Sequence, residues 1–276
     1  MGLDSLLYCA IQCAIQAGEA IMGVYNSEIL VEFKEDNSPL TLADKQANEV
    51  ITNLLKETPY PILSEEGKSI PYSERKDWER FWLVDPLDGT KEFIKRNGEF
   101  TVNIALIENG VPILGVIYVP VTDCLYFSTK ERGAYIVNDH NLDFEFELQI
   151  NNPDEPNEMK ILKHSGTKLP MKHNTRPFTA VASRSHLSAE TESFINTLKE
   201  KHGQVELISS GSSLKLCIVA EGKADVYPRL APTMEWDTAA GHAIAEAAGK
   251  QVLDYTTGMP LTYNKENLLN PSFIVQ

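Results

Sequence analysis

The chain has 276 residues, of which 42% are hydrophobic, and a formal net charge of −14 at pH 7. A chain of this size and apolar content can bury a large core, as one domain or as two closely packed halves. The acidic balance argues against a nucleic-acid polymer as partner, because phosphate backbones are bound by basic surfaces. A small phosphorylated ligand stays compatible with this charge if metal ions reverse the local field.

The sequence indicates a protein of a reducing compartment. Four cysteines lie in apolar surroundings without metal-ligand spacing: Cys9, Cys13, Cys124 and Cys217. We therefore expect buried thiols in the cytoplasm. The N-terminal region carries an early acid, Asp4, and lacks the basic start of a signal peptide. No apolar run reaches the length expected of a transmembrane segment. The choice between monomer and homodimer stays undecided.

The first half of the chain predicts two helices on a largely antiparallel sheet. Apolar residues recur at helical spacing over 4–25, and a second helix opens at Thr41 and runs to about Lys56. Glu108-Asn109-Gly110 is a strong hairpin turn. The expected strands are 30–33, 61–64, 81–84, 100–107, 112–119 and 124–128.

The second half alternates strands and helices, which is typical of a mixed α/β arrangement. The expected strands are 178–182, 204–208, 224–227 and 251–254, and the expected helices are 188–201, 212–221 and 238–248. Between the halves, residues 138–177 are polar and irregular. We therefore expect an α+β half over 1–150 and an α/β half over 178–276, joined by an irregular connection, 151–177, in one compact unit.

The most informative stretch is an apolar strand, 81–84, that ends in Asp85-Pro86-Leu87-Asp88-Gly89-Thr90. Two carboxylates three residues apart at the end of a rigid strand can face one point and supply the oxygen ligands that Mg²⁺ prefers. Gly89 lets backbone N–H groups approach an anion, and Thr90 adds a hydroxyl. Asp-Pro and Asp-Gly are also ordinary turn dipeptides, so the stretch taken alone fits a plain turn as well.

A second acidic group, Glu65-Glu66, follows the expected strand 61–64. If that strand lies beside 81–84, Glu65 falls near Asp85 and can share a metal with it. The alternative is a solvated acidic loop, the usual place for a Glu-Glu pair.

Two further aspartates each have a structural and a functional interpretation. Asp44 fits a capping box with Thr41, and it also fits a proton acceptor for Thr90 that helps activate a water molecule. Asp237 fits the N-cap of helix 238–248, and it also fits a metal ligand. Small residues follow Asp237, so this helix can start close to the sheet or to an anion.

Taken together, these motifs resemble the inositol monophosphatase superfamily of lithium-sensitive, Mg²⁺-dependent phosphatases. The resemblance is carried by Asp85–Thr90, by Glu65-Glu66 upstream and by Trp236-Asp237 downstream. It narrows to the bacterial 3′(2′),5′-bisphosphate nucleotidases of the CysQ type through the stretches 91–100, 183–186, 211–215 and 227–229. It covers roughly residues 5–273, apart from 138–177, and implies a layered α/β/α/β/α fold.

The resemblance also implies a two-metal site. Glu65, Asp85 and the Leu87 carbonyl would hold one Mg²⁺, and Asp85, Asp88 and Asp237 would hold a second. Asp44 and Thr90 would activate the water, and Glu66 would support a third, weaker ion. The substrate phosphate would lie on the Gly89 and Thr90 amides, in contact with the ligands Glu65, Leu87, Asp88 and Asp237. The nucleoside and its second phosphate would contact Ser183, His186, Ser212, Lys215 and Arg229.

The implied reaction is hydrolysis of the 3′-phosphate of adenosine 3′,5′-bisphosphate to AMP, with 3′-phosphoadenylyl sulfate as a related substrate in sulfur metabolism. The runner-up is an inositol monophosphatase or fructose-1,6-bisphosphatase activity that shares the metal core. A different class is a non-catalytic protein that binds a divalent ion or nucleotide. Ligand spacing disfavours its Ca²⁺-loop form. The resemblance places the enzyme in the cytoplasm and leaves open a peripheral position at the inner face of the membrane.

Overall fold

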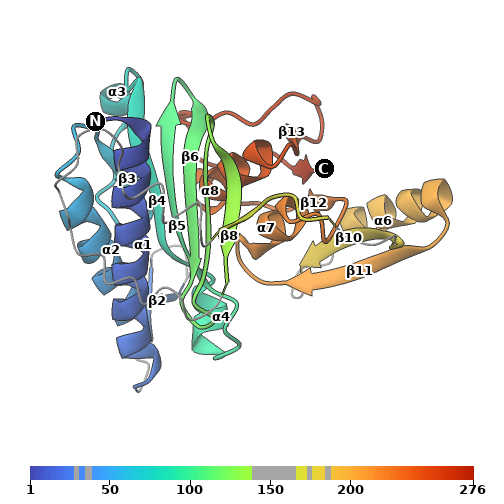
Figure 1. Ribbon diagram of the computed structural model, residues 1–276, viewed down its shortest axis with the longest axis horizontal. Helices are drawn as coiled ribbons and strands as arrows, with labels where there is room; N and C mark the ends of the chain where they lie inside the picture. Colours follow the sequence, from blue (N-terminus) through green and yellow to red (C-terminus); the bar gives the residue numbers. More distant parts are fainter. Residues whose placement is uncertain (28–30, 35–38, 139–165, 173–175, 184–187) are drawn as a thin grey trace.

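The structure, a computed structural model, describes residues 1–27, 31–34, 39–138, 166–172, 176–183 and 188–276. Layers of strands and helices alternate (Figure 1). A larger sheet of seven strands forms one strand layer, and a two-stranded and a three-stranded sheet of the second half form the other. Helices α1 (Leu3–Tyr25) and α2 (Leu42–Leu55) cover one face of the larger sheet. Helix α8 (Glu235–Ala247) covers its other face, and α7 (Leu214–Ala220) packs on α8. Beyond α7 lie the strands of the second half, with α6 on their outer side. The expected α/β/α/β/α layering is confirmed.

The larger sheet has seven strands in chain order, from β3 to β9. β3 is parallel to β4, and every later pair is antiparallel, as the hairpin signals predicted. Both faces of this sheet are covered, so its central strands are apolar and buried almost throughout. The strands are Ile62–Ser64, Arg80–Asp88, Thr101–Glu108, Val111–Val119, Cys124–Thr129, Gly133–Val137 and Thr167–Lys168.

Two long helices form the first layer, α1 at Leu3–Tyr25 and α2 at Leu42–Leu55, both as predicted. By length and composition alone α1 passes for a membrane span, with an 18-residue window of mean hydropathy 1.3. The sequence prediction, in contrast, is that no segment is long and apolar enough to span a membrane. Half of the window is buried, and α1 packs on α2 and β6, so the helix has the character of a core element.

The second half holds a parallel pair, β10 at Phe178–Ser183 and β11 at Val205–Ser210. An antiparallel trio follows, in the order β12, β14, β13, and a bridge from Ala180 to Val226 joins the two groups. The trio is Tyr227–Arg229, Phe273–Val275 and Val252–Asp254, and the helices are α6 at Ala189–His202, α7 at Leu214–Ala220 and α8 at Glu235–Ala247. Four short elements remain: β1 at Val31–Phe33, β2 at Pro39–Thr41, α3 at Tyr72–Arg75 and α4 at Thr90–Ile94.

Helix α8 lies very close to the larger sheet. A side chain at Gly115 on β6 would meet the Ala240 carbonyl oxygen at 2.4 Å, and one at Gly241 would meet Leu216 of α7 at 2.9 Å. Only glycine fits at either position. The prediction that small residues let this helix approach the sheet is therefore confirmed, and the approach brings the start of α8 to the acidic end of β4.

Several elements differ from the sequence prediction. The strand expected at 224–227 lies at β12, because Val226 forms only an isolated bridge to β10 before regular pairing begins. The helix expected from 238 begins at Glu235, since the Asp237 carboxylate accepts the Met234 N–H at 2.9 Å. Asp237 is thus the third residue of α8 and not its N-cap. Strands β2, β8, β9 and β14 were not predicted, and they exist only through their partners. β9 lies within the stretch 151–177 that was expected to be irregular throughout, and it was missed because two residues that pair with β8 carry no pattern of their own.

Candidate active site

The turn that follows β4 is shaped by its own residues. β4 pairs with β5 through Asp85 and again through Asp88, with the register broken between them. The Asp85 side chain accepts the Leu87 N–H at 3.0 Å, which fixes the bulge. Gly89 follows at φ +93°, where a Cβ would lie 3.2 Å from the Glu99 carbonyl oxygen. The plain-turn interpretation is therefore confirmed, and the same turn places the carboxylates of Asp85 and Asp88 at the end of β4. The functional interpretation stays a prediction.

Three carboxylates from three elements meet at this turn. Glu65 follows β3, which runs parallel to β4, and its N–H donates to the Val84 carbonyl at 3.1 Å. Asp237 comes from the first turn of α8. Glu65, Asp85 and Asp237 each offer an oxygen within 4.8 Å of the others. Such a set of hard oxygen donors suits a divalent cation.

The pKa values of the buried aspartates indicate that nearby cations do not balance the negative charge of this cluster. Burial, followed by the charges of the neighbouring acids, raises the pKa of Asp237 to about 8 and that of Asp85 well above its usual range. Burial also raises the pKa of Asp88 to about 6, although Lys215 opposes the rise. Carboxylates that are packed together out of water favour protonation unless a cation joins them. The residues present therefore fit a metal ion.

This arrangement predicts how pH affects the metal-free protein. Between about pH 5 and 8 the folded cluster holds protons that the unfolded chain has released, so stability should fall as pH rises. One pKa unit corresponds to about 1.4 kcal/mol, and each kcal/mol to roughly 2–4 °C in Tm. We expect Tm in chelator to drop by at least about 3 °C from pH 5.5 to pH 8, and Mg²⁺ to reverse the drop.

Thermal denaturation with and without Mg²⁺ across this pH range measures the effect. Asp237→Asn is the matched control, since it should flatten the pH dependence in chelator and weaken the response to Mg²⁺. A Tm in chelator that does not change with pH would contradict this account of the cluster.

The capping-box interpretation of Asp44 is confirmed, and the two oxygens of its carboxylate have different partners. Oδ2 accepts the Thr41 N–H at 2.7 Å and the Thr41 hydroxyl at 2.6 Å, which caps α2. Oδ1 accepts the Thr90 hydroxyl at 3.1 Å. Burial raises the pKa of Asp44 despite these hydrogen bonds. The cap fixes a carboxylate beside the hydroxyl that faces the site.

A lysine that the sequence analysis did not single out lies beside the two glutamates. The Lys34 ammonium donates to Glu65 at 2.8 Å and also to Glu66. Burial alone would lower the pKa of Lys34, but the two carboxylates outweigh it and raise the pKa. Lys34 directly follows β1, a short exposed strand, so no pattern in the sequence linked it to the site. Glu66 is thus held by an ammonium and is not free to meet a metal without displacing it.

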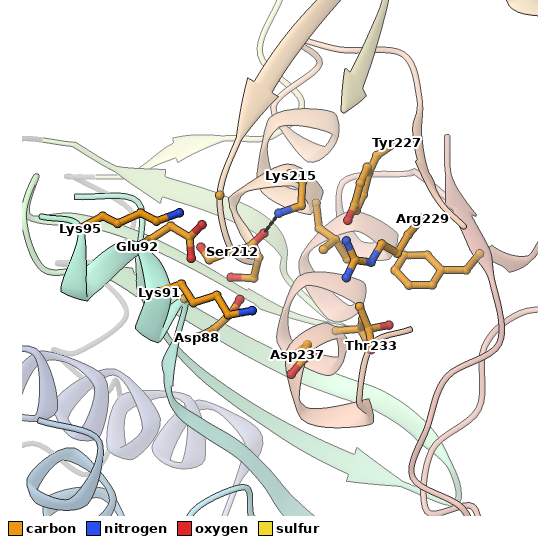
Figure 2. A pocket seen from close by; sticks show the side chains of 16 residues that line it. Asp88, Lys91, Glu92, Lys95, Ser212, Lys215, Tyr227, Arg229, Thr233 and Asp237 are labelled. Atoms are coloured by element: carbon orange, nitrogen blue, oxygen red, sulfur yellow. Dashed lines mark hydrogen bonds between the residues drawn. The ribbon is translucent and has the colours of Figure 1, made fainter. Parts of the chain in front are cut away.

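A pocket of about 360 Å³ opens next to the carboxylates (Figure 2). Its size lies within the range of small-molecule sites. Of the residues predicted for the site, the pocket is lined by Asp88, Gly89, Ser212, Lys215, Arg229 and Asp237. The lining residues that were not predicted include Lys91, Glu92, Lys95, Tyr227, Thr233 and Phe273. The first three lie in the stretch 91–100 that carried the resemblance to the nucleotidases, but no role was predicted for them.

Of the residues predicted to contact the substrate, five do not line the pocket: Glu65, Leu87, Thr90, Ser183 and His186. β10 ends at Ser183, whose side chain the structure does not describe, and His186 lies outside the described residues. Leu87 is buried, and its carbonyl accepts a weak hydrogen bond from Thr90 at 3.4 Å. Most of the residues predicted from separate stretches of sequence are therefore brought together around one turn.

The layered fold and the acidic cluster at the ends of β3 and β4 define a metal-dependent phosphatase. Residues 2–274 match the model of the inositol monophosphatase family, and the chain belongs to that family. A protein of Escherichia coli (strain K12) named 3′(2′),5′-bisphosphate nucleotidase CysQ is 46% identical over 269 residues, 96% of each chain.

Solved structures agree with this placement. A crystal structure of CysQ from Bacteroides thetaiotaomicron, a bacterial member of the inositol monophosphatase family, is 55% identical with a TM-score of 0.88, over 99% of this chain and 97% of that one. An inositol monophosphatase from Anabaena (Nostoc) sp. PCC 7120 is 24% identical with a TM-score of 0.70, over 100% and 92% of the chains, and shows the shared fold.

Proposed function

We propose that this protein is a Mg²⁺-dependent 3′(2′),5′-bisphosphate nucleotidase. It removes the 3′-phosphate of adenosine 3′,5′-bisphosphate to give AMP and phosphate, and it accepts 3′-phosphoadenylyl sulfate as a second substrate. The observation that carries this proposal is the 46% identity, over nearly the whole chain, to a protein of that name. The cation-lined pocket beside the acidic cluster supports it, because the substrate carries a second anionic group away from the reacting one.

The acidic cluster would hold two Mg²⁺ ions. Glu65, Asp85 and the Leu87 carbonyl fit the first, and Asp85, Asp88 and Asp237 fit the second. Two such ions neutralise the phosphate and lower the pKa of bound water. A third ion at Glu66 would have to displace Lys34.

The chain's own residues supply proton transfer and orientation. Thr90 can accept a proton from the attacking water at Oγ1 while it passes its own to Asp44 Oδ1, 3.1 Å away. The raised pKa of Asp44 suits a proton acceptor. The amides of Gly89 and Thr90 are proposed to bind the reacting phosphate, where charge develops during attack.

The rest of the pocket would recognise the nucleoside. Ser212, Lys215 and Arg229 line it, and Ser183 and His186 are proposed to complete it. The two halves of the chain, 1–150 and 178–276, are proposed to act as one unit, since Asp237 of the second half meets Glu65 and Asp85 of the first.

We also propose a cytoplasmic location. The four cysteines are free thiols, as expected in a reducing compartment. The expectation of buried thiols is confirmed for Cys13, Cys124 and Cys217, whereas Cys9 is only partly buried.

A substrate panel tests the proposed function. Phosphate release is measured from adenosine 3′,5′-bisphosphate, inositol 1-phosphate and fructose 1,6-bisphosphate, with Mg²⁺ and with chelator. We expect kcat/KM for the nucleotide to exceed the other two by at least about tenfold, and chelator to abolish release. Preference for inositol 1-phosphate or fructose 1,6-bisphosphate would favour an inositol monophosphatase or fructose-1,6-bisphosphatase over a nucleotidase. No release from any substrate would favour a binding protein.

A further inference from the structure

Four cationic side chains line the pocket, and they differ in how much of their charge is available to a ligand. They are Lys91, Lys95, Lys215 and Arg229. The second phosphate of a bisphosphate lies away from the metal ligands, so it has to be recognised by such cations. A cation can bind this phosphate most readily if it has no hydrogen bond or ion pair inside the protein that binding would break.

The ammonium of Lys215 is already hydrogen-bonded within the protein. Its side chain is buried, and Nζ donates to the Ser212 carbonyl at 2.5 Å and more weakly to the Ser210 carbonyl at 3.5 Å. The ammonium also lies 5.8 Å from the centre of the Tyr227 ring. Burial lowers the pKa of Lys215 to about 8, against the opposing charge of Asp88. Lys215 therefore holds the 210–212 loop and balances Asp88.

Lys91, in contrast to Lys215, has an exposed side chain. It directly follows Thr90 and lines the pocket from α4. Within the part of the chain that the structure describes, its ammonium makes no hydrogen bond and no ion pair. Figure 2 shows its side chain extending from α4 into the pocket. Of the nearby acids, Asp88 and Asp237 face the proposed metals, which leaves Glu92 as the remaining negative charge in the lining.

Arg229 faces the same space from the other side (Figure 2). Its Nη2 donates to the Pro232 carbonyl at 2.9 Å, while its buried Nε has no hydrogen-bond partner among the described residues. A guanidinium with a spare N–H suits a phosphate oxygen. Lys95 is also exposed and has no hydrogen bond or ion pair among the described residues, but it lies at the far end of α4, five residues after Thr90. The available cations nearest the turn are therefore Lys91 and, from the opposite wall of the pocket, Arg229.

We propose that Lys91, and not Lys215, is the specificity-determining lysine that grips the second phosphate, opposite Arg229. This inference rests on the proposed function and sharpens it, because it names the contact by which the site prefers a bisphosphate to a monophosphate. The side chain is anchored one residue after Thr90, so the ammonium is tied to the turn that holds the reacting phosphate.

The test compares kcat/KM for adenosine 3′,5′-bisphosphate and adenosine 3′-monophosphate. We expect Lys91→Gln to lower the ratio of the two by at least about tenfold, mainly through KM for the bisphosphate. Lys91→Arg should restore most of the ratio. Arg229→Ala should raise KM for the bisphosphate more than for the monophosphate. Lys215→Met should affect both substrates alike, because it loosens the shared loop and unbalances Asp88.

Lys199→Gln on α6 is the matched control, since it removes an exposed lysine outside the pocket and should change neither substrate. An unchanged ratio in Lys91→Gln, with bisphosphate cleavage by the wild type intact, overturns the role of Lys91 and leaves the proposed function standing. A ratio that shifts in Lys215→Met alone reverses the assignment. A wild type that does not cleave the bisphosphate overturns the proposed function, and this inference with it.

Discussion

Asp85→Asn is expected to lower kcat by at least about a thousandfold while the protein stays folded. Asp85 is 1% exposed and belongs to the triad with Glu65 and Asp237. Asparagine has the same shape but no charge, so it can keep the hydrogen bond to the Leu87 N–H and cannot replace the carboxylate toward a cation. Steady-state kinetics at saturating Mg²⁺ measure the loss.

The same variant should show that the loss is not caused by unfolding. In chelator its Tm should equal or exceed that of the wild type, because one of the repelling acids is neutral. Asp77→Asn, an exposed aspartate on the surface, serves as control and should keep both kcat and Tm. A kcat near the wild-type value in Asp85→Asn would remove Asp85 from the proposed metal site.

Asp44→Asn is expected to lower kcat by about 10²–10⁴-fold with little effect on KM. Asparagine can still accept hydrogen bonds from Thr41 and so cap α2, but it is a far weaker proton acceptor for Thr90. The loss should therefore appear in turnover at saturating substrate and not in binding. Kinetics and thermal denaturation on the same preparation separate the two.

Thr41→Val gives the matched control for Asp44. It removes the hydroxyl that bonds Asp44 Oδ2 and Ala43 N–H, at a cost of about 1 kcal/mol, and leaves the carboxylate in place. We expect Tm to fall while kcat stays within a fewfold of the wild type. If Thr41→Val lowers kcat as far as Asp44→Asn does, Asp44 acts only by positioning the helix and not as a proton acceptor.

Elements with strong local signals were predicted well. The apolar period of α1, the capping box of α2 and the Asn-Gly turn between β5 and β6 depend on residues a few positions apart. Ser188 caps α6 through the Thr191 N–H at 3.2 Å, as its sequence position indicated. Strands such as β2 and β14 were missed because three residues carry no period of their own. They are stabilised by partners distant in the chain.

In the candidate site, too, the residues of a local motif were predicted and the residues from distant stretches were not. The acids Asp85 and Asp88 are visible as a motif because the turn that places them is local. Lys34 and Asn103 are not, since each reaches the site from another stretch of the chain. Asn103 of β5 donates to Asp88 at 3.4 Å, and Lys34, which follows β1, donates to Glu65 at 2.8 Å. A lone lysine or asparagine in sequence is most often a surface residue, so no pattern marks it in advance.

The sequence by itself determined the order of the elements, the acidic turn after β4 and the family to which the chain belongs, because each depends on neighbouring residues in one stretch. Only the tertiary structure decided which charges meet. In the folded chain Asp237 lies beside Glu65 and Asp85, and Glu66 is paired with Lys34. Lys215 is buried, whereas the exposed side chain of Lys91 lines the pocket. The reason is physical: charge interactions act through space and depend on burial, and neither quantity is encoded in the spacing of residues along the chain.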